Sequence, residues 1–244
     1  MVKGLYTSNE GMKALLRKEE VLSNNLANVN TTSFKQSNLF TRAYLDYLNN
    51  DIRQPFLNDE HTIDEIVTDF SQGPMITTDN PLDVAIEGKA FMTIQGKDDA
   101  ELYTRSGSFT RDAQGQLATL NGEKVLGEHN GPISINGKSV NISEAGDVVV
   151  DGMIVDRIKL VQFKEPCHLL KEGNNLYSKS ETTEEEAMGS YFLHQGHLEG
   201  SNVNPVEMMV KMITAFRNYE ADQRSMQSTD QTLSKAVNEV GRIR

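Results

Sequence analysis

Residues 204–240 read NPVEMMVKMITAFRNYEADQRSMQSTDQTLSKAVNEV, and this stretch decides the fold of the C-terminal end of the chain. Its side chains follow an alternating spacing of three and four residues, which predicts a helix that packs against other helices. The seam residues are Met209, Met212, Phe216, Tyr219, Gln223, Met226, Asp230, Leu233, Val237 and Val240. Asn204 and Pro205 offer a polar cap and a proline at the first helical position. We therefore expect a helix from about Val206 to Val240, on the order of 50 Å long.

The N-terminal residues repeat this pattern. The same spacing is followed by Leu5, Ser8, Met12, Leu15, Glu19, Leu22, Leu26 and Val29. The string SNNLANVNTT at 23–32 then ends the predicted helix with amide and hydroxyl side chains. Two interpretations of its asparagines remain open. They cap a fraying helix end, or Asn24 and Asn28, one turn apart, bond across to another helix and set its register.

Two heptad helices at opposite ends of one chain can pair with each other as an antiparallel hairpin, or with other subunits. The C-terminal seam outruns its partner by about ten residues, and its first half is wider than a two-stranded contact needs. We therefore favour self-assembly through the ends and predict a subunit interface there. The residues expected at this interface are Leu5, Met12, Leu15, Leu22, Asn24, Asn25, Leu26, Asn28, Val29, Asn202, Val203, Asn204, Met209, Met212, Ile213, Phe216, Tyr219, Met226, Leu233, Val237 and Val240.

The middle of the chain has the texture of short strands. Two hairpins are predicted from turn dipeptides, one at Asn136-Gly137 between 133–135 and 140–142, and one at Asp151-Gly152 between 148–150 and 153–155. The predicted fold class is mixed α and all-β: terminal heptad helices form a coiled-coil core domain, and short antiparallel strands form a central all-β domain. The predicted division is an N-terminal helix with its Asn-rich motif at 1–35, an extended connector at 36–75, the β domain at 76–178, a second connector at 179–200 and the C-terminal helix at 201–244.

Composition excludes several classes of protein. The net charge is −11 and the sequence pI is about 5.0, which argues against a nucleic-acid-binding surface. The single cysteine, Cys167, excludes an internal disulfide framework and a Cys-based zinc cluster. No stretch is apolar and long enough for a transmembrane segment, and charges in the first 20 residues leave no room for a secretory signal.

Candidate chemical sites are weak. The loop 131–139 is close to a phosphate-binding pattern, but five residues instead of four lie between its glycines and no helix follows. His194 and His197 lack a nearby third ligand, and adjacent Cys167 and His168 would point to opposite faces of a strand. We therefore expect no catalytic residue, no metal site, no cofactor and no enzyme activity.

Several stretches of the chain have distinctive sequences. The string LSNNLANVNTTSFK at 22–35 closely resembles the N-terminal signature of the bacterial flagellar basal-body rod and hook proteins. LEGSNVNPVEMM at 198–209, with the residues that follow it, resembles the C-terminal signature of that family. YTRSGSF at 103–109, DAQG at 112–115 and GNNLY at 173–177 are similar to motifs of its central β domain. Departures are small: Ser33 and Ala90 stand where the family usually has glycine, and Ser106 where Asp or Asn is common.

The resemblance implies a structural subunit of the flagellar rod, the axial drive shaft that transmits torque and encloses the export channel. It implies a helical polymer whose core is built from terminal helices, contacts with neighbouring rod and hook proteins, and export by the flagellar type III apparatus without a cleaved signal. The length is closer to the proximal or distal rod proteins than to the longer hook protein. Terminal segments without partners in the monomer would fold only on joining the growing tip. The alternatives are a hook or other axial subunit, or a β-domain binding module on a coiled-coil stalk.

Overall fold

A computed structural model describes residues 2–41, 64–96, 99–180 and 182–240. The described residues divide into two compact units. Of the described residues, the helical unit draws on 2–27, 37–41, 64–67 and 204–240, and the β unit on 28–36, 68–96, 99–180 and 182–203. The fold is mixed, with two long helices and antiparallel strands, so the predicted class is confirmed at this level.

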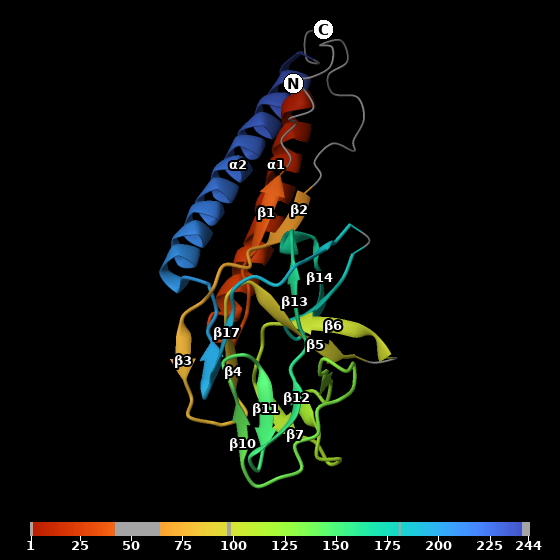
Figure 1. Cartoon of the computed structure of the whole chain (residues 1–244). Coiled ribbons are helices and arrows are strands. Elements are labelled where there is room, and N and C mark those ends of the chain that lie inside the picture. Colours follow the sequence, from red (N-terminus) through yellow and green to blue (C-terminus); the bar gives the residue numbers. More distant parts are fainter. Residues whose placement is uncertain (1, 42–63, 97–98, 181, 241–244) are drawn as a thin grey trace. The chain divides into compact units, whose positions relative to one another are not determined.

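The helical unit contains α1 (Val2–Ala27), α2 (Pro205–Val240) and a two-stranded sheet of β1 (Ser37–Thr41) and β2 (Asp64–Thr68). The two helices pack against each other, and α1 also contacts β1. They are antiparallel, because the start of α1 and the end of α2 lie at the same end of the pair (Figure 1). The hairpin that the sequence left as an alternative is thus formed within the chain.

The face that α2 turns toward α1 differs by one residue from part of the predicted seam. Its buried and half-buried positions are Met208, Met212, Ala215, Tyr219, Asp222, Met226 and Thr229, while Glu220, which is also half-buried, lies on another side. At 100° per residue these positions share one side of the helix, whereas Met209 and Phe216 lie on another side and are exposed. The predicted seam therefore mixed two faces, because the first half of α2 is apolar on both.

Among the described residues, the remaining strands form four sheets in the β unit. The strands are β3 (Met75–Thr77), β4 (Val84–Glu87), β5 (Ala90–Gln95), β6 (Glu101–Thr104), β7 (Phe109–Arg111), β8 (Leu117–Thr119), β9 (Lys124–Val125), β10 (Val140–Ile142), β11 (Asp147–Val150), β12 (Met153–Arg157), β13 (Leu160–Phe163), β14 (Leu170–Gly173), β15 (Leu176–Ser178), β16 (Glu185–Glu186), β17 (Phe192–Gln195) and β18 (His197–Glu199). A short 3₁₀ helix, η3, spans Pro166–His168.

The largest sheet runs in the order β14-β15-β6-β5-β9-β8-β7, with β13 paired to both β5 and β16. The strands β10, β11 and β12 form a separate meander, while β17 pairs with β4 and β18 with β3. The strands nearest the C-terminal end of the unit therefore pair with its first strands. This pairing brings residue 199 back to the segment around residue 73, where the functional site lies.

Two hydrophobic clusters fill the β unit. One is aliphatic and includes Ile86, Met92 and Ile158, each almost fully buried. The other is aromatic and built around Phe91, whose ring meets Phe70 edge-on at a centroid distance of 5.3 Å. Such edge-to-face pairs add about 1 kcal/mol each beyond the area they bury. The aromatic cluster is also the apolar wall of the charged site described below.

One predicted hairpin is confirmed and the other is wrong. Asp151 and Gly152 both have positive φ angles, 49° and 85°, and join β11 to β12. Asn136-Gly137 does not join two paired strands, because β10 pairs with β11 instead. Ile133 and Ile135 are instead buried in the core, beside β8 and β9. The expected connector at 179–200 also contributes β16, β17 and β18.

Candidate functional site

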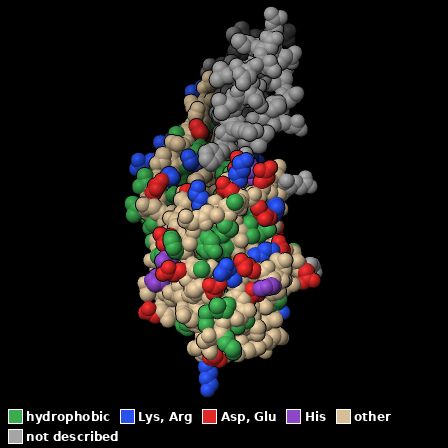
Figure 2. Space-filling view, viewed as in Figure 1, with side chains coloured by type: hydrophobic (Ala, Val, Ile, Leu, Met, Phe, Trp, Pro, Cys, Tyr) green, Lys and Arg blue, Asp and Glu red, His purple; other side chains and the backbone are tan. Residues whose placement is uncertain are grey.

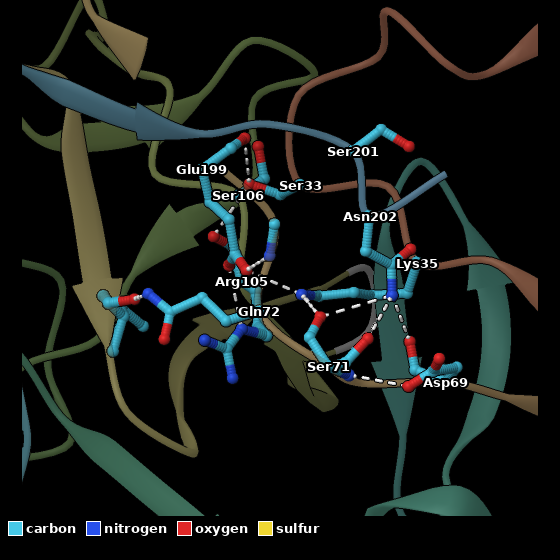
Figure 3. A network of polar contacts seen from close by, with 12 residues as sticks. Ser33, Lys35, Asp69, Ser71, Gln72, Arg105, Ser106, Glu199, Ser201 and Asn202 are labelled. Carbon is cyan, nitrogen blue, oxygen red and sulfur yellow. Dashed lines mark hydrogen bonds and ion pairs between the residues drawn. The ribbon is translucent and has the colours of Figure 1, made fainter. Parts of the chain in front are cut away.

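A buried charge cluster lies inside the β unit, with Glu199 at its centre (Figure 3). The Lys35 Nζ donates to Glu199 Oε1 at 2.6 Å, and the Arg105 Nε donates to Glu199 Oε2 at 3.0 Å. The exposed fractions of the Lys35, Arg105 and Glu199 side chains are 0%, 2% and 0%. Charges this deep remain ionised only when partners satisfy them, so the three side chains form one interdependent set.

Backbone groups complete the coordination of these charges. The Lys35 Nζ also donates to the carbonyl of Ser71 at 2.7 Å, and the Arg105 Nη2 to the carbonyl of Gly88 at 2.8 Å. The Gly73 N–H donates to Glu199 Oε1 at 2.9 Å. Gly73 must be glycine here, because a Cβ would overlap the carbonyl oxygen of Gly200. The cluster therefore requires a close backbone approach that only glycine permits.

The pKa values of Lys35 and Asp69 in the site are shifted by their surroundings. Burial lowers the pKa of Lys35, and the charge of Glu199 offsets part of that decrease. Burial raises the pKa of Asp69, but hydrogen bonds from Ser71 and Gln36 and the charge of Lys35 outweigh it, so that this pKa lies below its usual value. The site therefore favours ionised Asp69 beside a cation.

Asn202 adds a neutral bridge between the same segments. Its Oδ1 accepts from the Gln36 N–H at 2.8 Å, and its Nδ2 donates to the carbonyl of Asp69 at 2.8 Å. One amide side chain thus links the segment after α1, the segment before β3 and the segment after β18. Asn202 was expected at a subunit interface, but in this chain it connects parts of a single β unit.

The recognisable sequence motifs meet at this site. The Ser33 Oγ donates to the carbonyl of Arg105 at 3.0 Å, and the Asn175 Nδ2 donates to the carbonyl of Thr32 at 2.8 Å. The Lys171 Nζ donates to the carbonyl of Lys35 at 2.9 Å. The strings at 22–35, 103–109, 173–177 and 198–209 therefore converge through these contacts and those of Glu199. The four motifs therefore pack around one centre in the β unit.

The structure separates the predicted interface residues into four groups. Buried within the chain are Leu22, Asn25 and Val203. Half-buried are Met12, Leu15, Leu26, Asn28, Val29, Asn202, Met212, Tyr219 and Met226. Exposed are Asn24, Asn204, Met209, Ile213 and Phe216. Outside the described side chains are Leu5, Leu233, Val237 and Val240.

Two of the predicted asparagines have a local role. Asn25 bonds twice to Ser37, donating to its carbonyl at 2.8 Å and accepting from its N–H at 2.9 Å, and it thereby imitates a neighbouring strand. Asn204 caps α2 as expected, because its Oδ1 accepts from the N–H groups of Val206 and Glu207.

One face of α2 carries an exposed apolar stripe, which we call the α2 stripe. It consists of Val206, Met209, Val210, Ile213 and Phe216, each at least half exposed. On the same side of the helix the next turns present Arg217, Glu220 and Arg224. The apolar surface is thus confined to the first three turns, and the described residues beyond it on that side are charged or polar. Exposed apolar clusters of this kind are typical of surfaces that contact other proteins.

The weaker chemical candidates stay without a shared site. His194 pairs with Glu87 at 2.8 Å, and exposed Cys167 lies in η3. Among the described residues, no three His, Cys, Asp or Glu side chains are grouped as metal ligands. Neither described helix is long and apolar enough to span a bilayer. On the face shown in Figure 2, acidic and basic side chains are interspersed over the β unit.

Sequence reasoning did not single out Lys35, Arg105 and Glu199. All three lie in quoted motifs, but charged residues are usually solvated, and nothing local marks these as buried. The available signal was their position, since each sits inside a motif of mostly small and uncharged residues. Only the pairing of distant segments reveals that the three charges meet.

Comparisons with known proteins cover the whole chain. Three family models match: the flagella basal body rod protein over residues 5–35, the flagellar hook protein FlgE/F/G D1 domain over 85–150, and the flagellar basal body rod FlgEFG protein C-terminal over 194–239. The chain is 33% identical over 249 residues to the flagellar basal-body rod protein FlgF of Caulobacter vibrioides, with all of both chains covered.

Two further relatives agree. The flagellar basal-body rod protein FlgG of Borreliella burgdorferi is 34% identical over 261 residues, with 98% of each chain covered. The flagellar hook-basal body complex protein FlhO of Bacillus subtilis is 31% identical over 271 residues, with all of both chains covered.

Helices at both ends of the chain, a β unit between them and matches along its whole length define a structural subunit of the flagellar axis. The chain belongs to the flagellar basal-body rod protein family. It is a structural protein of the basal body and not an enzyme.

Proposed function

We propose that this protein polymerises through its terminal helices into the rod that transmits torque and encloses the export channel. The α2 stripe carries the proposal. Its five apolar side chains are exposed although α2 is already paired with α1. The chain alone therefore leaves a helical surface uncovered that a neighbouring subunit can bury.

The free energy gained by burying the side chains of the α2 stripe is large enough to support assembly. Complete burial of a Met, Ile, Val or Phe side chain is worth about 1.5–3 kcal/mol. Phe216, Ile213 and Met209 are each about half exposed, so a neighbour can gain roughly half of that value from each. Repeated at every subunit contact, this gain supports a polymer of many weakly joined copies. Contacts that do not close on themselves produce a filament.

The finer architecture follows as part of the same proposal. Helices α1 and α2 of many subunits form a coiled-coil core, the β unit lies outside it, and the chain meets neighbouring rod and hook proteins above and below. We place the protein in the flagellar basal body, delivered by the type III export apparatus. The proposed division into 1–35, 36–75, 76–178, 179–200 and 201–244 carries over, with the qualification that 28–36 and 200–203 pack in the β unit.

The predicted role for unpaired ends needs revision. The α1–α2 contact covers one face of each helix in the single chain, so a complete absence of internal partners is not what this fold shows. Among the described large apolar side chains of the two helices, those of the α2 stripe and Leu16 of α1 stay exposed. The surface proposed for neighbouring subunits is accordingly this stripe, together with the exposed Asn24.

The test replaces Phe216 by Asp in the full chain. A buried carboxylate at the subunit contact costs more than the lost phenyl surface, so the concentration needed for polymerisation should rise by at least about tenfold. Pelleting of polymer against protein concentration measures this, and swimming of a complemented deletion strain reports it in cells. Gln231→Asp is the matched control, because Gln231 lies on the same side of α2 beyond the stripe and is exposed.

The proposal fails if Phe216→Asp polymerises and supports swimming as well as Gln231→Asp does. A closed dimer or trimer of the unaltered chain in sedimentation velocity would instead favour the β-domain binding module on a stalk. The family membership does not favour that alternative. A variant that sediments as a folded monomer separates lost assembly from lost folding.

A further inference from the structure

Glu199 occupies a position where four chain segments meet. Lys35 comes from the segment after α1, Arg105 from the segment after β6, Gly73 from the segment before β3, and Glu199 itself ends β18. The Lys35 and Arg105 contacts are buried, the Gly73 contact is partly buried, and all lie within the β unit. The carboxylate is therefore the common partner of residues up to 164 positions apart in the sequence.

The three fully buried side chains Lys35, Arg105 and Glu199 carry two positive charges and one negative charge. The half-buried carboxylate of Asp69 interacts with Lys35 and supplies a further negative charge. Loss of Glu199 would leave Lys35 and Arg105 close together without the carboxylate that bonds to both. Loss of Lys35 would leave Glu199 still paired with Arg105. Charge arithmetic thus predicts strongly unequal effects for the two partners of one ion pair.

We infer that Glu199 is a positioning residue whose charge holds the N-terminal motif segment, 28–36, in the β unit. Its carboxylate pairs with Lys35 and Arg105 at once, so the segment can be buried only when the C-terminal motif is in place. The β unit is then complete only when both ends of the chain have joined it. This role concerns the single subunit and does not depend on how subunits assemble.

A neutral hydrogen-bonding role would behave differently. If Glu199 acted only as an acceptor, Glu199→Gln would keep an acceptor oxygen for Gly73 and Lys35, and its effect would not depend on the charge at position 35. If the charge matters, removal of Lys35 relieves the defect caused by Glu199→Gln. The double variant loses one positive and one negative charge and so restores the native net charge of the site, and Arg105 keeps the carbonyl of Gly88 as a partner.

The experiment compares Glu199→Gln, Lys35→Met and the double variant in the full chain, kept dilute. We expect Glu199→Gln to lower Tm by on the order of 10 °C, as befits a broken buried ion pair in a protein of this size. Lys35→Met should lower Tm less. The double variant should melt above Glu199→Gln alone, and this rescue is the decisive observation.

Hydrogen exchange locates the effect. In Glu199→Gln, the amides of 28–36 and 71–73 should exchange at least tenfold faster, whereas those of the β11–β12 hairpin should keep their protection. Glu101→Gln is the matched control, because Glu101 also pairs with a lysine, Lys159 at 2.7 Å, but is 46% exposed. Its Tm should stay close to that of the unaltered chain.

Two results would overturn the inference. In the first, the effects of Glu199→Gln and Lys35→Met add, so that the double variant is the least stable of the three. In the second, exchange in 28–36 is unchanged by Glu199→Gln. If Glu199→Gln does not fold at all, the double variant still decides: folding of the double variant supports the charge role, and failure to fold while Lys35→Met folds contradicts it.

Discussion

Ser33 has a φ angle of 58°, in the left-handed region that L-residues rarely adopt, and its side chain is fully buried. Its hydroxyl donates to the carbonyl of Arg105, and its N–H donates to the carbonyl of Glu199 at 2.7 Å. Related proteins were expected to carry glycine here, which adopts this conformation without strain. The serine hydroxyl therefore offsets a backbone cost of about 1 kcal/mol with a buried hydrogen bond.

This balance predicts an order of stability at position 33. Ser33→Ala keeps the backbone strain and loses the hydrogen bond, so it should destabilise the chain by about 1–2 kcal/mol. Ser33→Gly loses the same bond but removes the strain, so it should be more stable than Ser33→Ala by about 1 kcal/mol. Urea unfolding of both variants measures the difference. Equal stability of the two variants would show that the φ angle carries no strain.

The lowered pKa of Asp69 predicts a pH dependence. Burial raises this pKa, but hydrogen bonds from Ser71 and Gln36 and the charge of Lys35 lower it by more. The folded chain therefore binds the proton less tightly than the unfolded chain does. The stabilising share of the carboxylate is thus present above the unfolded pKa of 3.8 and is lost as pH falls through the folded value.

Asp69→Asn removes this titration. The Tm advantage of the unaltered chain over Asp69→Asn should therefore be largest near neutral pH and shrink as pH falls below about 4. Melting curves from about pH 7 to pH 3 measure it. Asp230→Asn, on the exposed surface of α2, is the control, and its Tm difference should stay small throughout. A constant difference for Asp69→Asn would rule out the linkage.

At the scale of elements, periodicity identified both helices because their packing repeats along the sequence. Pro205 starts α2 and Asn204 caps it, as expected from local chemistry. The spacing could not decide which of two neighbouring apolar lines of α2 faces α1. Met208 and Met209 have the same hydrophobic character, yet one is buried and the other is half exposed. Only the docked partner distinguishes them.

The turn dipeptides likewise did not suffice to predict which strands pair. Both Asn136-Gly137 and Asp151-Gly152 are good hairpin dipeptides, and only the second joins paired strands. The residues that flank Asn136-Gly137 have other partners. Ile135 is buried in the aliphatic core, and Val140 pairs with Val150. Burial of isoleucine outweighs the local turn preference, and neither Asn136 nor Gly137 has the positive φ angle that the predicted hairpin turn requires.

At the scale of the whole molecule, the β unit is discontinuous in sequence. It needs 28–36 as well as 68–203, although the predicted β domain was 76–178. A trimmed chain of 36–200 would lack Phe34 and Val203, both buried, and would leave Glu199 without Lys35. A chain shortened to these predicted boundaries would thus lack part of the core.

This discontinuity predicts the behaviour of fragments. A fragment of 28–203 should melt cooperatively and at a higher temperature than one of 36–200, because it keeps Phe34, Lys35, Asn202 and Val203. Differential scanning calorimetry of the two fragments measures the gap, which we expect to be on the order of 10 °C. Identical melting of both would show that the terminal motifs add nothing to the β unit.

The amino-acid sequence by itself determined the two terminal helices, the cap of α2, the β texture of the middle and, through its motifs, the protein family. These are local or repetitive features, which a short window of residues can specify. Only the tertiary structure decided which side of α2 stays exposed and that Glu199 meets Lys35 and Arg105. The physical reason is that burial depends on partners far away in the sequence, and no local pattern reveals that a charged side chain will be enclosed by them.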